Sequence, residues 1–208
     1  MAAPFPDGVG RKHYGLEVFI PRVSGYPVGR RSRAASHAAG RWCTTRWRYR
    51  GRRAAAETRA SASVTVAASQ ERAFSVFTEG MGTWWPLDTH HIGAADAAAA
   101  VLEPRVGGRL FERGVDGSEC DWGRVLVWEP PDRFAYVWQI NADWQHDTSI
   151  ESEVEVRFIA EGPTRTRVEL EHRKLETFGD KAENMHEAFD SSGGWGALLE
   201  SFASAAAA

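Results

Sequence analysis

The sequence predicts an α+β fold in which a curved antiparallel sheet wraps a helix near the C-terminus. Two segments, 149–158 and 164–174, alternate apolar and charged residues, which is typical of antiparallel strands with one wet and one buried face. Residues 180–202 then change to the period of a helix. A sheet with one apolar face needs a cover, and this last helix is the large apolar element left to supply it.

The first predicted elements are a strand at 61–69 and a helix at 70–80. Two valines alternate with small polar residues in the strand. Ser69 is a suitable N-cap for the helix, in which Phe74 and Phe77 share one face. The domain is therefore predicted to begin with a strand followed by a helix.

Residues 80–93 are too rich in Gly and Pro for a regular element, yet they contain the adjacent Trp84 and Trp85. A loop with so much apolar surface is expected to pack against other apolar groups of the domain. Two hypotheses remain open: the two rings form a hydrophobic plug, or they form a lid at the mouth of a cavity.

Four short strands follow the loop. Residues 97–114 give two strands joined around 104–108, and residues 123–138 give a hairpin whose arms are separated by Pro130 and Pro131. The alternation predicts that Arg124 shares one face of the first arm with Trp122, where it meets either a carboxylate ligand or a protein acid. The other residues predicted to share a face are Leu126 and Trp128 on the first arm and Phe134, Tyr136, Trp138 and Ile140 on the second.

The last two strands, 149–158 and 164–174, predict a solvated outer face of Glu and Arg side chains, whose cross-strand pairs contribute about 0.2–1 kcal/mol each. His172 falls on the inward face by the same alternation. Three roles are open for it: a hydrogen-bonded core residue, a polar anchor for a ligand, or a general acid or base.

The terminal helix, 180–202, contains Gly193 and Gly194 in its interior. Glycine in a helix costs about 1 kcal/mol relative to Ala. A bend or a close approach of two backbone segments is therefore expected at this point.

Charge divides the 208 residues into two parts. Residues 1–60 carry 13 Lys and Arg against 3 Asp and Glu, whereas residues 61–208 carry 12 against 25. The segment 29–60 mixes Arg with small residues without a sustained period and is predicted to be disordered. It is either an extension absent from the natural product, with translation starting near Val64 or somewhat before it, a nucleic-acid arm, or a transit peptide.

The residue types and motifs present limit the kinds of functional site that the sequence predicts. Cys43 and Cys120 form no metal motif, and the adjacent His90 and His91 point in opposite directions in an extended segment, so no metal site is predicted. No stretch has the length of a membrane span, and no apolar leader is visible, so a cytoplasmic protein that does not insert into a membrane is expected. No nucleophilic or phosphate-binding motif appears in its required context.

The motifs together resemble one known group of proteins. The sequence is similar to the SRPBCC, or START-like, superfamily. Within that superfamily it resembles the proteins related to the C-terminal domain of the activator of Hsp90 ATPase. The resemblance covers about residues 61–204 and none of 1–60. The segments that carry it are FTEGMGTWWPLDTHHIG, LEPRVGGRLFE, DWGRVLVWEPPDRFAYVWQ, VEVRF, TRVELEHR and GGWGALLESFA.

The resemblance implies a helix-grip fold of the START-like, Bet v 1-like type: a curved seven-stranded antiparallel sheet around a long C-terminal helix, with a mostly apolar cavity between them. The expected organisation is a disordered extension at 1–60 and one domain at 61–206. Members of the superfamily bind lipids, hormones or polyketides, and some are cyclases or hydrolases. They share no catalytic motif, so no catalytic residue is assigned.

The leading hypothesis is a non-catalytic or weakly catalytic small-molecule-binding protein, whose cavity takes a hydrophobic or aromatic molecule. No cofactor is expected, and no nucleic acid is expected on the folded domain. The alternatives are a polyketide-cyclase-like or small-hydrolase enzyme that uses the same cavity, and an Hsp90-type chaperone-associated module. The residues expected at the cavity or its mouth are Trp84, Trp85, Phe111, Trp122, Arg124, Phe134, Tyr136, Trp138, His172, Trp195 and Leu199.

Overall fold

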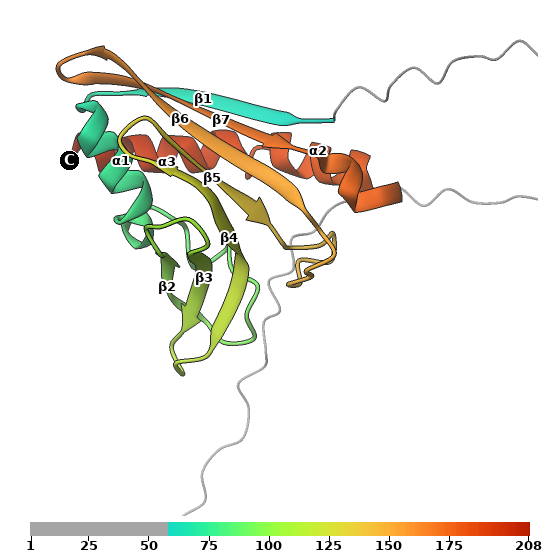
Figure 1. The fold of residues 1–208 in the computed structure, drawn as a ribbon. Coiled ribbons are helices and arrows are strands. Elements are labelled where there is room, and N and C mark those ends of the chain that lie inside the picture. Colours follow the sequence, from blue (N-terminus) through green and yellow to red (C-terminus); the bar gives the residue numbers. More distant parts are fainter. Residues whose placement is uncertain (1–57) are drawn as a thin grey trace, which may run out of the picture. The chain divides into compact units, whose positions relative to one another are not determined.

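A computed structural model describes residues 58–208 of the chain (Figure 1). The predictions made for the Arg-rich segment before residue 58 lie outside the described residues. Seven strands, three α-helices and two 3-10 helices follow one another in this range. They are β1 (Ala60–Val66), α1 (Gln70–Thr78), η1 (Met81–Thr83), β2 (Ala97–Leu102), β3 (Arg109–Gly114), β4 (Glu119–Glu129), β5 (Arg133–Trp138), β6 (Ser152–Gly162), β7 (Arg165–Arg173), η2 (Leu175–Lys181), α2 (Ala182–Asp190) and α3 (Trp195–Ala207).

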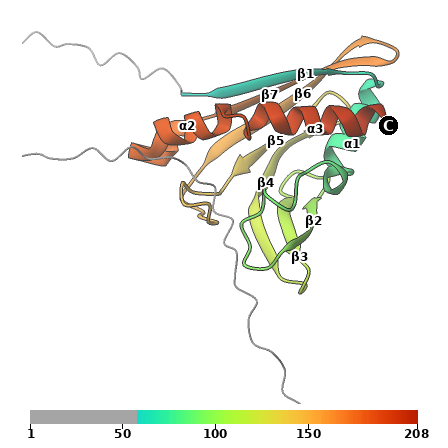
Figure 2. The ribbon, with the colours of Figure 1, turned by 180° about the vertical axis from the view of Figure 1, so that it is seen from behind.

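All seven strands form one antiparallel sheet in the order β1-β7-β6-β5-β4-β3-β2. The first two strands of the chain therefore lie at opposite edges. The sheet curls around α3, which runs across its concave side (Figure 2). The predicted α+β architecture, a curved seven-stranded antiparallel sheet that grips a C-terminal helix, is confirmed.

Helix α1 begins where the sequence predicts. The hydroxyl of Ser69 accepts a hydrogen bond from the Arg72 amide at 3.3 Å, which caps the first turn. Phe74 and Phe77 are buried on the inner side of α1, and each packs against Phe158 of β6. The helix thereby covers the end of the sheet that α3 reaches with its last turns.

The terminal helical segment is interrupted, as predicted, and the interruption is complete: α2 ends at Asp190 and α3 begins at Trp195. A second break precedes α2, because Gly179 has φ 60° and ψ −125° inside η2. Side chains with a Cβ rarely adopt that positive φ, so the chain requires Gly there. Helix α2 is thus a short element with a backbone break on either side.

The outer face of the sheet is less solvated at its centre than predicted. Glu155 on β6 has a side chain that is only 6% exposed, because three Arg side chains surround its carboxylate. The distances from that carboxylate are 2.5 Å to Arg157, 3.1 Å to Arg133 and 3.7 Å to Arg173. Long guanidinium side chains on neighbouring strands cover a short acid, which a period-two pattern cannot reveal.

Candidate functional site

The concave face of the sheet is lined by aromatic rings. Most of the predicted cavity residues lie there, buried against α3 or the loop after α1. They are Trp84, Trp85, Trp122, Phe134, Tyr136, Trp138, His172, Trp195 and Leu199. The predicted inward face of β5 is confirmed, and a role of these residues in binding stays a prediction.

Phe111 and Arg124 do not belong to this lining. Leu110 and Glu112, on either side of Phe111 in β3, point inward, so Phe111 points outward. Its ring is buried on the outer face, where it lies under the Arg109 guanidinium at 4.2 Å. The side chain of Arg124 is 52% exposed and lies 3.8 Å from Asp121. The prediction that these two residues face the interior is wrong.

Two β-bulges on β4 explain the error for Arg124. The partners of Leu110 and Phe111 on β4 are Gly123 and Asp121, so Trp122 is an extra residue, and Leu126 is a second one opposite β5. Each extra residue inverts the alternation that follows it. Arg124 therefore leaves the face of Trp122, and Leu126, predicted to share that face, is 42% exposed.

The loop after α1 closes one flank of the interior. Trp84 donates its indole N–H to the Val76 carbonyl at 3.1 Å, and Trp85 donates to the His90 carbonyl at 2.8 Å. The loop is also bound to α3, since the Ser201 hydroxyl donates to the Trp84 carbonyl at 2.6 Å. At its other end His90 Nε2 lies 3.0 Å from the Gly193 carbonyl, to which only a donor can bind. The two Trp rings therefore plug this flank in the present conformation.

Glu112 holds the end of that loop. Its buried carboxylate accepts the amides of Ile92, at 2.9 Å, and Gly93, and the indole N–H of Trp122 at 2.8 Å. Trp122 in turn packs on Trp85, with ring centroids 5.1 Å apart. An acid on the inward face of β3 thus fixes both the loop and the bulged strand.

A second group of buried polar atoms lies at the end of the sheet near α2. We call the five residues there the polar cluster: Trp138, Ser152, His172, Phe189 and Trp195. The His172 ring lies 4.3 Å from Phe189, 5.5 Å from Trp138 and 5.8 Å from Trp195, measured between centroids. His172 Nε2 lies 2.9 Å from the Ser152 hydroxyl. Three aromatic rings therefore surround one imidazole.

Burial without a charged neighbour determines the protonation of this cluster. Desolvation lowers the pKa of His172 from 6.5 to about 3, so the ring is neutral at pH 7. Burial also raises the pKa of Tyr136 on β5, so its hydroxyl keeps its proton. The polar cluster is therefore an uncharged environment with hydrogen-bonding groups.

Two polar atoms of the cluster lack a hydrogen-bond partner among residues 58–208. They are Nδ1 of His172 and Nε1 of Trp195. In contrast, the indole N–H of Trp138 donates to the Ile140 carbonyl at 3.0 Å. Buried polar groups in proteins are nearly always paired. Two unpaired atoms in adjoining rings therefore make the polar cluster the candidate site for a ligand.

Gly194 determines how α3 meets the polar cluster. A Cβ at this position would lie 2.0 Å from the Phe189 carbonyl oxygen. That contact is with backbone, which cannot rotate away. Gly194 therefore allows the close approach that brings Phe189 of α2 and Trp195 of α3 into contact, with ring centroids 5.9 Å apart.

Replacing Gly194 by Ala is expected to lower the free energy of unfolding by about 2–3 kcal/mol, because the methyl group overlaps backbone. Gly196→Ala is the matched control: no atom lies within 4 Å of its Cβ position, and it lies inside α3. The control is expected to raise stability by about 0.5–1 kcal/mol through helix propensity. Urea denaturation checks both, and equal stability of the two variants would contradict the close approach.

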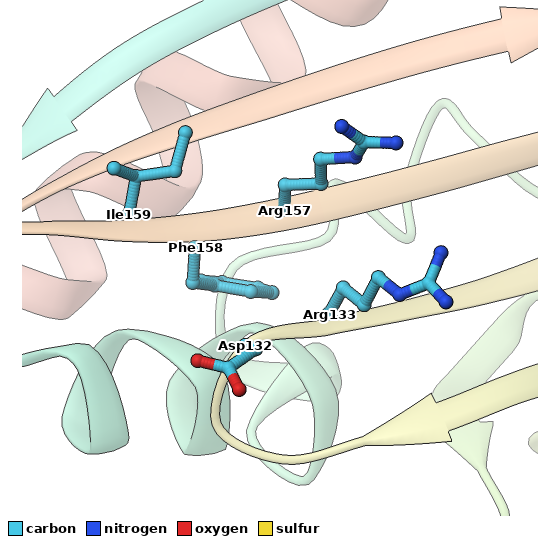
Figure 3. A pocket seen from close by; sticks show the side chains of 5 residues that line it. All are labelled: Asp132, Arg133, Arg157, Phe158 and Ile159. Atoms are coloured by element: carbon cyan, nitrogen blue, oxygen red, sulfur yellow. The ribbon is translucent and has the colours of Figure 1, made fainter.

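The pocket that the structure describes lies away from the polar cluster. It is an open depression of about 370 Å³ at the β4–β5 turn, bordered by Asp132, Arg133, Arg157, Phe158 and Ile159 (Figure 3). Both Arg side chains there already pair with Glu155. An enclosed cavity between sheet and α3 is not shown for residues 58–208.

Within 58–208, no group of three or more His, Cys, Asp and Glu side chains is placed to hold a metal ion. No helix in that range is both long and apolar enough to cross a membrane.

Comparisons with solved structures place this geometry among known proteins. The anthrahydroquino-gamma-pyrone synthase Txn09, complexed with SUM, is 44% identical, with a TM-score of 0.51 over 70% of this chain and 95% of that one. CalC, a self-sacrificing resistance protein from Micromonospora echinospora, is 30% identical, with a TM-score of 0.54 over 72% and 93% of the two chains. Protein NE0264 from Nitrosomonas europaea, 13% identical with a TM-score of 0.51 over 71% and 93%, shares the fold.

No curated protein matches the sequence. A family model does: the one described as Activator of Hsp90 ATPase homolog 1-like protein matches residues 67–207. That range runs from the end of β1 to the end of α3, so it includes the sheet from β2 to β7 and the polar cluster. The chain belongs to the family of Activator of Hsp90 ATPase homolog 1-like proteins, as the resemblance of its motifs predicted.

Proposed function

We propose that the chain binds a planar aromatic small molecule in its interior, at the polar cluster between the sheet, α2 and α3. The observation that carries the proposal is the pair of unpaired atoms, His172 Nδ1 and Trp195 Nε1, inside a box of aromatic rings. An unpaired buried polar group costs about 1–3 kcal/mol, which a ligand with polar atoms removes. Apolar walls with a few polar groups are typical of small-molecule sites.

The neighbours support the class of ligand. The name of Txn09 describes a synthase of an anthrahydroquinone fused to a pyrone, which is a flat polycyclic aromatic system. At 44% identity over nearly the whole of that chain, a related occupant of this interior is the simplest expectation. Within the predicted class of hydrophobic or aromatic ligands, we therefore propose a fused-ring natural product.

Access requires movement, because both unpaired nitrogens are buried, on side chains that are 0% and 4% exposed. Helix α2 is the element suited to move: it lies between the backbone break at Gly179 and the break that ends at Gly194, and its Phe189 covers His172. Short segments with breaks at both ends are typical hinged elements. Displacement of Phe189 would expose both unpaired nitrogens to a ligand.

Titration with danthron, a dihydroxyanthraquinone, tests this proposal by calorimetry and by hydrogen exchange. We expect saturable one-to-one binding, with slower exchange of amides in α2 and the first turn of α3. The variant Arg157→Gln in the surface depression is the matched control and is expected to leave the Kd unchanged. Protection confined to residues 132–133 and 157–159, or no saturable binding, would contradict an interior site.

A ring-forming enzyme in the same interior is the second candidate, favoured by the identity with Txn09. A γ-pyrone forms when a phenol oxygen attacks the distal ketone of an aryl diketone and water leaves. Incubation with ortho-hydroxybenzoylacetone tests this, with faster loss of water and appearance of methylchromone than in buffer as the expected result. A rate equal to that in buffer, for a protein that binds danthron, would leave binding without turnover.

A further inference from the structure

We infer that Trp195 and His172 select ligands by an oxygen-bearing edge, so that the chain recognises hydroxylated aromatic ketones and not hydrocarbon or lipid chains of similar size. This inference rests on the proposed binding function and names the chemical groups of the ligand that the polar cluster recognises. It depends on three observations: the donor character of Trp195, the adaptable proton of His172, and the separation of the two rings.

Trp195 requires an acceptor. An indole N–H only donates, and in this chain it is buried in a side chain that is 4% exposed, without a partner among the described residues. A carbonyl or phenol oxygen satisfies it, whereas a methylene or an aromatic C–H does not. Binding a hydrocarbon would leave this donor unpaired, at the same free-energy cost as in the free protein.

His172 accommodates either a donor or an acceptor. Its Nε2 faces the Ser152 hydroxyl, which can both donate and accept. When the hydroxyl donates to Nε2, the neutral ring carries its proton on Nδ1 and donates to a carbonyl. When Nε2–H donates to the hydroxyl, Nδ1 is free to accept a phenol O–H. The Ser152–His172 pair thus allows Nδ1 to match the neighbouring oxygen of the ligand.

The two rings lie close enough for one ligand to reach both. Their centroids are 5.8 Å apart at an interplanar angle of 69°. A fused aromatic with a hydroxyl beside a carbonyl carries two adjacent oxygens on one edge. Phe189 and Trp138, whose rings lie within 6 Å of those of His172 and Trp195, provide faces for its rings.

The test compares the affinities of two probes of similar size, danthron and anthracene, by quenching of tryptophan fluorescence in the same small fraction of dimethyl sulfoxide. For the unmodified protein we expect danthron to bind at least tenfold more tightly than anthracene. In Trp195→Phe that ratio is expected to fall at least about threefold, because the N–H donor is gone while the ring and His172 remain. Any loss of packing from the smaller ring affects both probes alike, so the ratio isolates the hydrogen bond.

Trp144→Phe is the matched control. Trp144 lies outside the polar cluster and is 40% exposed, so the same change of side chain is expected to leave the ratio unchanged. A tenfold ratio retained in Trp195→Phe, or equal binding of both probes to the unmodified protein, would overturn the inference while the binding function stood. Failure of danthron to bind would instead overturn the proposed function and the inference with it.

Discussion

Replacing Glu112 by Leu is expected to lower the free energy of unfolding by about 3 kcal/mol, because it leaves three N–H donors without an acceptor. Those donors are the amides of Ile92 and Gly93 and the indole of Trp122. The side chains are similar in volume, so packing changes little. Urea denaturation measures the loss, and hydrogen exchange is expected to show faster exchange at Ile92 and Gly93 than in the unmodified protein.

Glu112→Gln is the control for this prediction. It keeps the shape and one carbonyl acceptor, so we expect it to recover about half of the lost stability. Glu112→Leu with unchanged stability and unchanged exchange at the two amides would show that the carboxylate does not hold the loop. Because Trp85 packs on Trp122, the same loss should also loosen the plug formed by the two loop Trp rings.

The strands β6 and β7 could be predicted from the sequence because one face of each meets water. Val154, Val156 and Phe158 are buried, as are Val168 and Leu170, in the alternation that the sequence shows. Their register is uniform, apart from one irregularity near Gly162, so no extra residue disturbs the pattern. Period two is informative where the pairing is regular.

Strand β4 could be only partly predicted, for a physical reason. Residues 125–128 are continuously apolar, so the residue that the second bulge inserts leaves no trace in a hydrophobicity pattern. Phe111 shows a related limit: an apolar ring lies outside under Arg109, while Glu112, an acid, lies inside. Specific side-chain contacts, with Arg109 on the same strand for Phe111 and with Trp122 of β4 for Glu112, reversed the usual preference at both positions.

The candidate site could be predicted residue by residue but not as a cluster. His172 was expected on the inward face and Trp195 near the break of the terminal helix, and both lie there. Ser152 and Phe189 were not expected among the binding residues, because their contacts with His172 join segments 20 and 17 positions away in the chain. Which atoms stay unpaired depends on those contacts, so no sequence pattern could show it.

The stability of the fold is expected to depend on the protonation of His172. Burial lowers its pKa from 6.5 to about 3, and its ring neighbours Trp138, Phe189 and Trp195 carry no charge that could compensate. Between these two pH values the unfolded chain binds a proton that the folded chain does not. The contribution is therefore fully present above pH 6.5 and is lost as the pH falls toward 3.

The expected loss from this group is about 1.4 kcal/mol per pH unit below pH 6, or about 3 kcal/mol between pH 7 and pH 4. Urea denaturation across this range, on the unmodified protein and on His172→Gln, measures the difference. Carboxylates and exposed His residues titrate alike in both proteins, so their contribution cancels. The unmodified protein should show the steeper decline, whereas parallel curves would mean that His172 takes up its proton in the folded state as easily as in the unfolded chain. A ligand that accepts or donates a hydrogen bond at Nδ1 of the neutral ring should steepen the decline further, because it favours the form that acid removes.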